Sequence, residues 1–129
     1  MEKGEQNLLP VEFVNKLQED EEIIAVLLYG SYARGESYRD IDICIVLDKK
    51  YDKLNMSKKR VAYSSLVDKK FDVQIFQQLP LYVRKRILKE GKVMLLKNED
   101  ALYDVAFSTI KEFEYYRKSY ENYLAGMRK

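Results

Sequence analysis

The sequence contains no histidine and no tryptophan, one cysteine and two prolines among its 129 residues. Without histidine, the common zinc sites and every catalytic triad that needs an imidazole base are excluded. The single cysteine, Cys44, cannot form an internal disulfide, and we expect it to be a small core residue. Any catalysis must therefore rely on carboxylates, hydroxyls and cations.

Long hydrophobic runs are also absent from the sequence. The longest runs reach about a third of the length that a membrane span requires, so we expect no membrane partner. The first residues lack the basic start and the apolar core of a signal peptide, which predicts a cytoplasmic protein. At 129 residues the chain has the length of one domain, which we expect to cover 1–129.

The net charge of +2 conceals an uneven distribution of charge along the chain. Residues 1–22 hold seven acids against two lysines, whereas residues 49–70 hold eight bases against two acids. A basic middle segment suits a polyanionic ligand, but the same side chains could be the solvated face of a helix and its loops. The sequence leaves both interpretations open.

Hydrophobic periodicity predicts an alternation of helices and short strands. Helices are expected over 10–20, 57–67, 80–90 and 99–124, and strands over 23–29, 40–47, 71–76 and 93–96. Gly91 is expected to end the third helix in a left-handed conformation. This alternation predicts an α/β (α+β) fold, with helices on one face of a small sheet and the other face free to hold a site.

Acidic side chains stand at the beginning of two of the expected strands. Asp40 and Asp42 are separated by one residue, so a strand places both carboxylates on one face, about 6 to 7 Å apart at their Cα atoms. Asp72 begins a later strand. Three carboxylates in one cleft repel one another unless a divalent ion neutralises them, and Mg²⁺ suits such oxygen ligands. With two Mg²⁺ ions, one would activate an attacking oxygen and the other would stabilise a leaving pyrophosphate. Asp72 would then be either a metal ligand or a base for the incoming hydroxyl.

The strand that precedes these acids ends in a Gly-Ser pair. Gly30 allows the backbone to approach a ligand closely, and the Ser31 hydroxyl with the following amides can donate to phosphate oxygens. This is not a P-loop, because residues 30–37 lack its Gly-Lys-Ser/Thr ending. Arg34 is either a contact to phosphate or to an acceptor, or an ordinary solvated arginine.

Taken together, these residues resemble a known family. Gly-Ser at 30–31, Asp-Ile-Asp at 40–42 and Asp72 within Phe-Asp-Val-Gln-Ile resemble the nucleotidyltransferase superfamily named after DNA polymerase beta. They are most similar to its minimal MNT-type members, which pair with HEPN partners in prokaryotic toxin–antitoxin modules. The resemblance implies a small mixed sheet, a nucleotide bound at Gly30 and Ser31, metal ligands at Asp40 and Asp42, and a third acid of the site at Asp72. The passage 32–39 departs from these members, because it has eight residues instead of about ten.

The resemblance also implies an activity. It implies a Mg²⁺-dependent transfer of AMP from ATP to a hydroxyl of a protein partner, a HEPN toxin that the transfer silences. Two alternatives stay open: a non-catalytic antitoxin that acts by steric occlusion, and a transferase that acts on a small molecule or an RNA end. The absence of a further substrate domain argues against the last, so nucleic acid is not an expected partner. A homo-oligomer stays open.

The last expected helix is long for a domain of this size. About 25 residues, which we assign as 99–125, span roughly 37 Å. Aromatic residues occupy more than one of its faces, namely Phe113, Tyr115, Tyr116, Tyr120 and Tyr123. The helix either packs along its own sheet or projects as an amphipathic arm that docks against a partner protein.

Overall fold

The computed structural model describes residues 9–37 and 39–127. The elements are α2 (Val11–Glu19), β1 (Ile23–Tyr29), α3 (Gly30–Ala33), β2 (Ile41–Leu47), α4 (Lys53–Ser64), β3 (Phe71–Ile75), the short 3-10 helix η1 (Phe76–Gln78), α5 (Leu81–Glu90), β4 (Lys92–Leu96) and α6 (Glu99–Met127). The strands form one sheet in the order β3-β2-β1-β4. β1 is antiparallel to β2 and β4, whereas β2 and β3 are parallel, so the expected mixed α/β sheet is confirmed.

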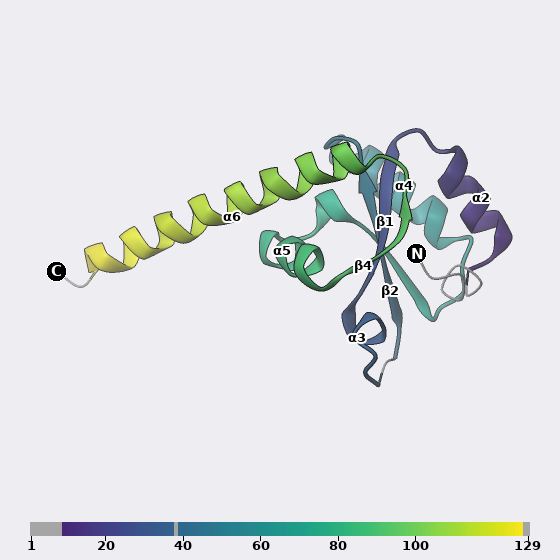
Figure 1. The fold of residues 1–129 in the computed structure, drawn as a ribbon, viewed down its shortest axis with the longest axis horizontal. Helices are drawn as coiled ribbons and strands as arrows, with labels where there is room; N and C mark the ends of the chain where they lie inside the picture. The colour runs from purple at the N-terminus through teal and green to yellow at the C-terminus, as the bar shows by residue number, and fades with distance from the viewer. Residues whose placement is uncertain (1–8, 38, 128–129) are drawn as a thin grey trace.

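Helices cover both faces of this sheet (Figure 1). On one face lie α2 and α4, where Phe13 and Tyr63 meet edge to face with their ring centres 5.7 Å apart. On the other face α5 and the start of α6 pack near Cys44, Val46 and Phe76. The prediction of helices on one face only was wrong, because β1 and β2 are apolar on both sides and a second layer must cover them. The expected core position of Cys44 is confirmed.

Two local features differ from the sequence-based expectations. α4 begins four residues before its predicted start, because the Asp52 carboxylate caps it by accepting from the Asn55 N–H at 2.8 Å. Gly91 is not left-handed, since its φ is −69°. Glycine is needed there for space instead, because a Cβ on Gly91 would lie 2.6 Å from the Ile87 carbonyl oxygen.

A single lysine ties the first helix to the far edge of the sheet. The Lys97 ammonium donates to the carbonyl oxygens of Leu17, Gln18 and Asp20 at 3.0, 3.0 and 2.6 Å. These carbonyls lie at the C-terminus of α2, where the last carbonyl groups of a helix have no intrahelical hydrogen-bond donor and a cation is favourable. The Asp20 carboxylate also pairs with Lys59 of α4 at 2.6 Å. The end of α2 is therefore fixed from two sides.

Only the first part of α6 packs against the domain. Its opening turns contact the sheet, and its middle lies against α5, where Glu112 pairs with Arg84 and the Phe113 ring lies under Lys85. The last turns continue away from the body of the protein (Figure 1). On the projecting part Tyr116, Tyr120 and Tyr123 are 60%, 52% and 62% exposed. The helix therefore packs on the domain over its first half and projects over its second half, and its role as a partner-binding arm stays a prediction. Within residues 9–37 and 39–127, no helix combines the length and the hydrophobicity that crossing a membrane requires.

Candidate functional site

Three side chains lie at the same level across neighbouring strands. The register pairs Tyr29 of β1 with Asp42 of β2, and Asp42 with Asp72 of β3. Adjacent strands are about 4.8 Å apart, so parallel pairing of β2 and β3 makes the two acids direct neighbours. The structure thereby brings together two of the three predicted carboxylates.

The Asp42 carboxyl group is half-buried between like charges. Burial, and after it the negative charges of Asp72 and Asp40, raise the pKa of Asp42 to about 6. Asp42 and Asp72 also share a side-chain hydrogen bond, which favours the protonated form. The nearby Arg34 cation lowers this pKa by less. The site thus concentrates negative charge that a bound cation would relieve.

The carboxylates of Asp40, Asp42 and Asp72 suit a hard divalent cation, but they do not form a preassembled metal site. Asp40, just before β2, and Asp72 are both exposed, and Asp72 Oδ1 accepts from Gln74 Nε2 at 2.9 Å. Nowhere in the described part of the chain do three acidic or cysteine side chains converge on one point suited to a metal ion. Mg²⁺ is commonly held by one or two carboxylates, with water and phosphate oxygens as its other ligands. Asp42 and Asp72 fit that pattern, with Asp40 beside the pair.

Gly30 occupies a position that no other residue could fill. Its φ of +79° lies in the left-handed region, which disfavours any side chain. A Cβ on Gly30 would also overlap Oδ2 of Asp42. α3 therefore begins directly against the Asp42 carboxylate, and Ser31 follows in its first turn. The Gly-Ser turn and the acidic strand form one contiguous site.

A cavity of about 210 Å³ opens beside Asp42, between α3 and α5. Its lining consists of Tyr29, Gly30, Ser31, Arg34, Asp42, Val83, Arg86, Ile87 and Glu90. The three residues predicted to bind phosphate, Gly30, Ser31 and Arg34, thus border one space together with Asp42. Asp40 and Asp72 do not line it.

The guanidinium of Arg34 is held by two carboxylates. Its Nε lies 3.0 Å from Glu36 Oε1, and its Nη1 lies 3.5 Å from Glu90 Oε2. Exposed ion pairs of this kind contribute little, typically below about 1 kcal/mol. Arg34 can therefore exchange a carboxylate for a phosphate at small cost.

Two charged residues that line the cavity, Arg86 and Glu90, were not predicted from the sequence as site residues. α5 carries several cations, and charge alone does not tell which of them faces the cavity. The useful signal is helical spacing, because Arg86 and Glu90 are one turn apart and flank the buried Ile87. Arg84, by contrast, turns away and pairs with Glu112 at 3.3 Å.

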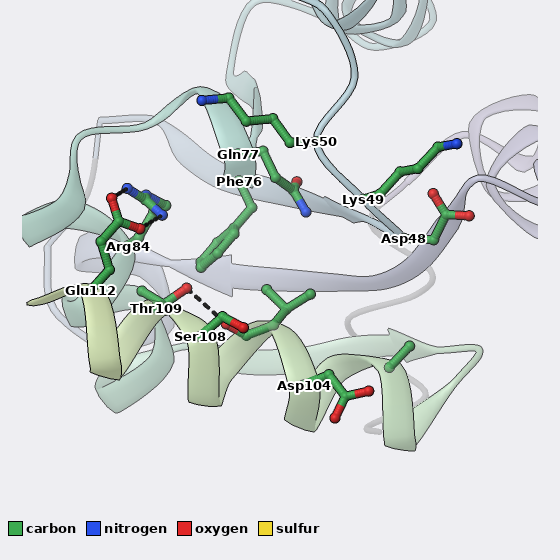
Figure 2. A pocket seen from close by; sticks show the side chains of 12 residues that line it. Asp48, Lys49, Lys50, Phe76, Gln77, Arg84, Asp104, Ser108, Thr109 and Glu112 are labelled. Carbon is green, nitrogen blue, oxygen red and sulfur yellow. Dashed lines mark hydrogen bonds and ion pairs between the residues drawn. The ribbon is translucent and has the colours of Figure 1, made fainter.

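A larger cavity lies elsewhere in the protein (Figure 2). It measures about 400 Å³, and Arg84 and Glu112 face each other at its edge while Phe76 reaches into it. It adjoins Asp48, beyond the end of β2 that is remote from Asp42. Because none of the predicted site residues lines it, size alone does not make it the candidate site.

Most of the sequence matches the model of one protein family. The profile of the family described as "Polymerase beta, Nucleotidyltransferase" matches residues 12–100. A relative in Methanocaldococcus jannaschii, provisionally named a protein adenylyltransferase, is 38% identical over 77 residues, which are 56% of this chain and 55% of that protein. The chain thus spans about half the length of that relative. The family match contains every predicted site residue.

Several solved structures share the fold at low sequence identity. A chain of a mutant MntA-HpeT toxin–antitoxin crystal structure superposes with a TM-score of 0.66 at 14% identity, covering 97% of this chain and 98% of that one. A chain of a toxin–antitoxin crystallised with AMP-PNP gives 0.64 at 18% identity, covering 92% and 98%. A chain of the complex of tri-AMPylated Shewanella oneidensis HEPN toxin with MNT antitoxin gives 0.61 at 16% identity, covering 92% and 95%. At these identities the likeness shows the fold, which confirms the expected architecture.

Proposed function

Because this chain belongs to the polymerase beta nucleotidyltransferase family, we propose that it transfers AMP from ATP to a hydroxyl group of a protein partner. The observation that carries the proposal is the position of Asp42. It lies between the cavity beside Gly30 and Ser31 on one side and the exposed Asp72 carboxylate on the other. Support for ATP and a protein acceptor comes from the relative named as an adenylyltransferase and from the neighbours with AMP-PNP and an AMPylated toxin.

Asp40, Asp42 and Asp72 are the residues that we propose to hold Mg²⁺. Bound Mg²⁺ would neutralise the carboxylates and the phosphate oxygens. The raised pKa of Asp42 supports this role, because its carboxylate carries charge that the protein itself does not compensate. The three acids do not form a ready-made cluster in the described residues, so substrate phosphates must complete the coordination.

Different side chains would serve the acceptor hydroxyl and the leaving pyrophosphate. Asp72 faces solvent, and Gln74 engages only one of its oxygens, Oδ1. We assign the Asp72 carboxylate to accept the proton of the acceptor hydroxyl, whose oxygen then attacks the α-phosphorus of ATP. The bond from the α-phosphorus to the bridging oxygen breaks, and pyrophosphate departs into the cavity. There the Ser31 hydroxyl and Arg34 can donate to its oxygens.

The projecting part of α6 is the surface that we propose for the partner, a HEPN toxin. Phe113, Tyr116, Tyr120 and Tyr123 recur at spacings of three, four and three residues, which forms one stripe along the helix. The stripe begins against Lys85 of α5 and continues along the projecting part. Aromatic residues with an interspersed arginine, here Arg117, are enriched at protein interfaces. The cytoplasmic location and a homo-oligomer stay predictions.

Labelled ATP tests the proposal directly. With Mg²⁺ and the HEPN protein encoded beside this chain, if its gene has such a neighbour, we expect the label on that protein and none with Asp42→Asn. Asp104→Asn, which removes an exposed acid from α6, is the matched control and should transfer normally. Label transfer by Asp42→Asn would overturn the site assignment.

One observation favours the non-catalytic antitoxin as a second candidate. The exposed tyrosines of α6 suit the binding of a partner whether or not AMP is transferred to it. If the wild type binds the HEPN protein tightly and silences it without any label transfer, steric occlusion replaces catalysis as the function. Label found on an RNA end or a small molecule would instead identify a different acceptor.

A further inference from the structure

We propose that α5 forms the second wall of the nucleotide site, where Arg86 binds the pyrophosphate end of ATP. The inference rests on the proposed function and adds to it a residue that neither the Gly-Ser turn nor the acidic strands supply. Arg86 would be a binding residue for the leaving group, in direct contact with substrate.

The position of α5 supports this assignment. One face of the helix, formed by Val83, Arg86, Ile87 and Glu90, lines the cavity beside Asp42. Val83 and Ile87 are apolar, and Ile87 is only 1% exposed, so these two residues form the inner, apolar part of the cavity lining. Arg86 and Glu90 are exposed and stand at its rim. The rim faces the Gly-Ser turn across a space of about 210 Å³.

The direction of the reaction decides which end of ATP occupies the cavity. The reacting α-phosphorus must lie near both Asp42 and Asp72. Asp72 lies on the solvent side and does not line the cavity, so an acceptor hydroxyl approaches from there. In phosphoryl-type transfer the attacking and leaving oxygens are roughly in line. The leaving pyrophosphate therefore points away from Asp72, past Asp42 and into the cavity.

Arg86 is the cation of this wall that is available for a ligand. In residues 9–37 and 39–127 no hydrogen bond or ion pair engages its guanidinium, whereas Arg34 on the opposite wall pairs with Glu36 and Glu90. On the same helix Arg84 donates to the Leu79 carbonyl at 3.0 Å. A free guanidinium at the rim of a pyrophosphate cavity can form two parallel hydrogen bonds to phosphate oxygens.

Nucleotide binding in the presence of Mg²⁺ tests the inference without relying on turnover. We expect Arg86→Gln to weaken Mg-ATP and Mg-pyrophosphate binding by about tenfold or more, measured by calorimetry, because a charge-assisted contact is lost. AMP binding should stay unchanged, since AMP lacks the phosphates that Arg86 contacts. Arg86→Lys should restore part of the ATP affinity.

A matched variant separates a direct contact from a general effect of charge. Lys89→Gln removes the same charge from an exposed position of the same helix that does not line the cavity, and should leave ATP affinity within about twofold. Equal ATP affinities of Arg86→Gln and the wild type would overturn this inference alone. A wild type that binds no Mg-ATP would overturn the proposed function and this inference with it. An equal loss of AMP binding in Arg86→Gln would also overturn the inference, because it would place Arg86 at the nucleoside end.

Discussion

The backbone of Gly30 lies directly against the carboxylate of Asp42, so closely that no side chain fits between them. Gly30 starts α3 after one strand, and Asp42 belongs to the neighbouring antiparallel strand. The Gly-Ser turn and the acidic strand therefore fix each other's position. This contact is the structural reason why the two parts of the motif act as one site.

Replacing this glycine should damage the site far more than replacing the next one. Gly30→Ala must overcome both a φ of +79° and an overlap with Asp42, so we expect a loss of more than about 2 kcal/mol in unfolding free energy and of ATP binding. Gly35 has a similar φ of +74° but open space around it. Gly35→Ala should cost about 1 kcal/mol and preserve binding. Denaturant unfolding and calorimetry check both, and equal losses would refute the steric role of Asp42.

Stability should depend on pH through Asp42. Its folded-state pKa, near 6, is raised above the ordinary carboxyl value, so the contribution of this group is fully present at pH 4 and below and is lost as the pH rises through 6. Asp42→Asn should therefore melt at a higher temperature than the wild type at pH 7.5, with the difference disappearing toward pH 4. Melting curves without divalent ions between pH 4 and 8 measure this. A variant that is less stable at pH 7.5 would contradict the prediction.

Mg²⁺ should act on the same group. Because a metal ligand must be deprotonated, Mg²⁺ should raise the melting temperature of the wild type above pH 6 and lose this effect below it. Asp42→Asn should respond little at any pH. An equal response of both proteins would place the ion elsewhere.

Glu90 should restrain Arg34 in the absence of nucleotide. Glu90→Gln removes one partner of the guanidinium, and we expect ATP to bind up to about fivefold more tightly, the scale of an exposed ion pair. The effect should vanish when Arg34→Gln is already present, which a double-mutant cycle measures. Tighter binding that persists without Arg34 would show a general effect of charge instead.

The projecting tyrosines should matter for partner binding and little for folding. Tyr120→Ala with Tyr123→Ala removes two side chains that are more than half exposed, so the unfolding free energy should change by less than about 0.5 kcal/mol. Affinity for the HEPN protein should fall by tenfold or more. Lys118→Ala, also exposed on α6, is the control. Unchanged affinity of the double variant would remove the role assigned to this stripe.

Lys97 should be important for stability alone. Lys97→Met leaves three carbonyls at the end of α2 without their common donor, and we expect a loss of about 0.5 to 1.5 kcal/mol by denaturant unfolding, because water replaces part of the lost contacts. Lys58→Met, at an exposed position of α4, should change the unfolding free energy by less than about 0.5 kcal/mol. Equal effects would show that the Lys97 contacts contribute nothing specific.

Most elements were predictable because their signals are local. The run of apolar residues in β1 and the alternation after Asp40 specify strands, and the helices follow from their 3.6-residue spacing. The error at the start of α4 was local, because the Asp52 cap was missed. Gly91 matches a left-handed helix cap in sequence, but its φ is −69°, and a Cβ there would lie 3.3 Å from the carbonyl oxygen of Leu28 in the remote strand β1. The second helical layer depends on how α5 folds back over the sheet.

The sequence by itself determined the strands, the Gly-Ser turn and the identity of the three acids, because each depends on neighbours within a few residues. Only the tertiary structure decided that Asp42 and Asp72 are adjacent, since this requires the parallel pairing of β2 and β3, which lie far apart in the chain. It also decided that Arg86, and not another cation of α5, borders the cavity. The local sequence gives the chemical type of each side chain. The distances between the side chains of a site depend on contacts between segments that are remote in the sequence.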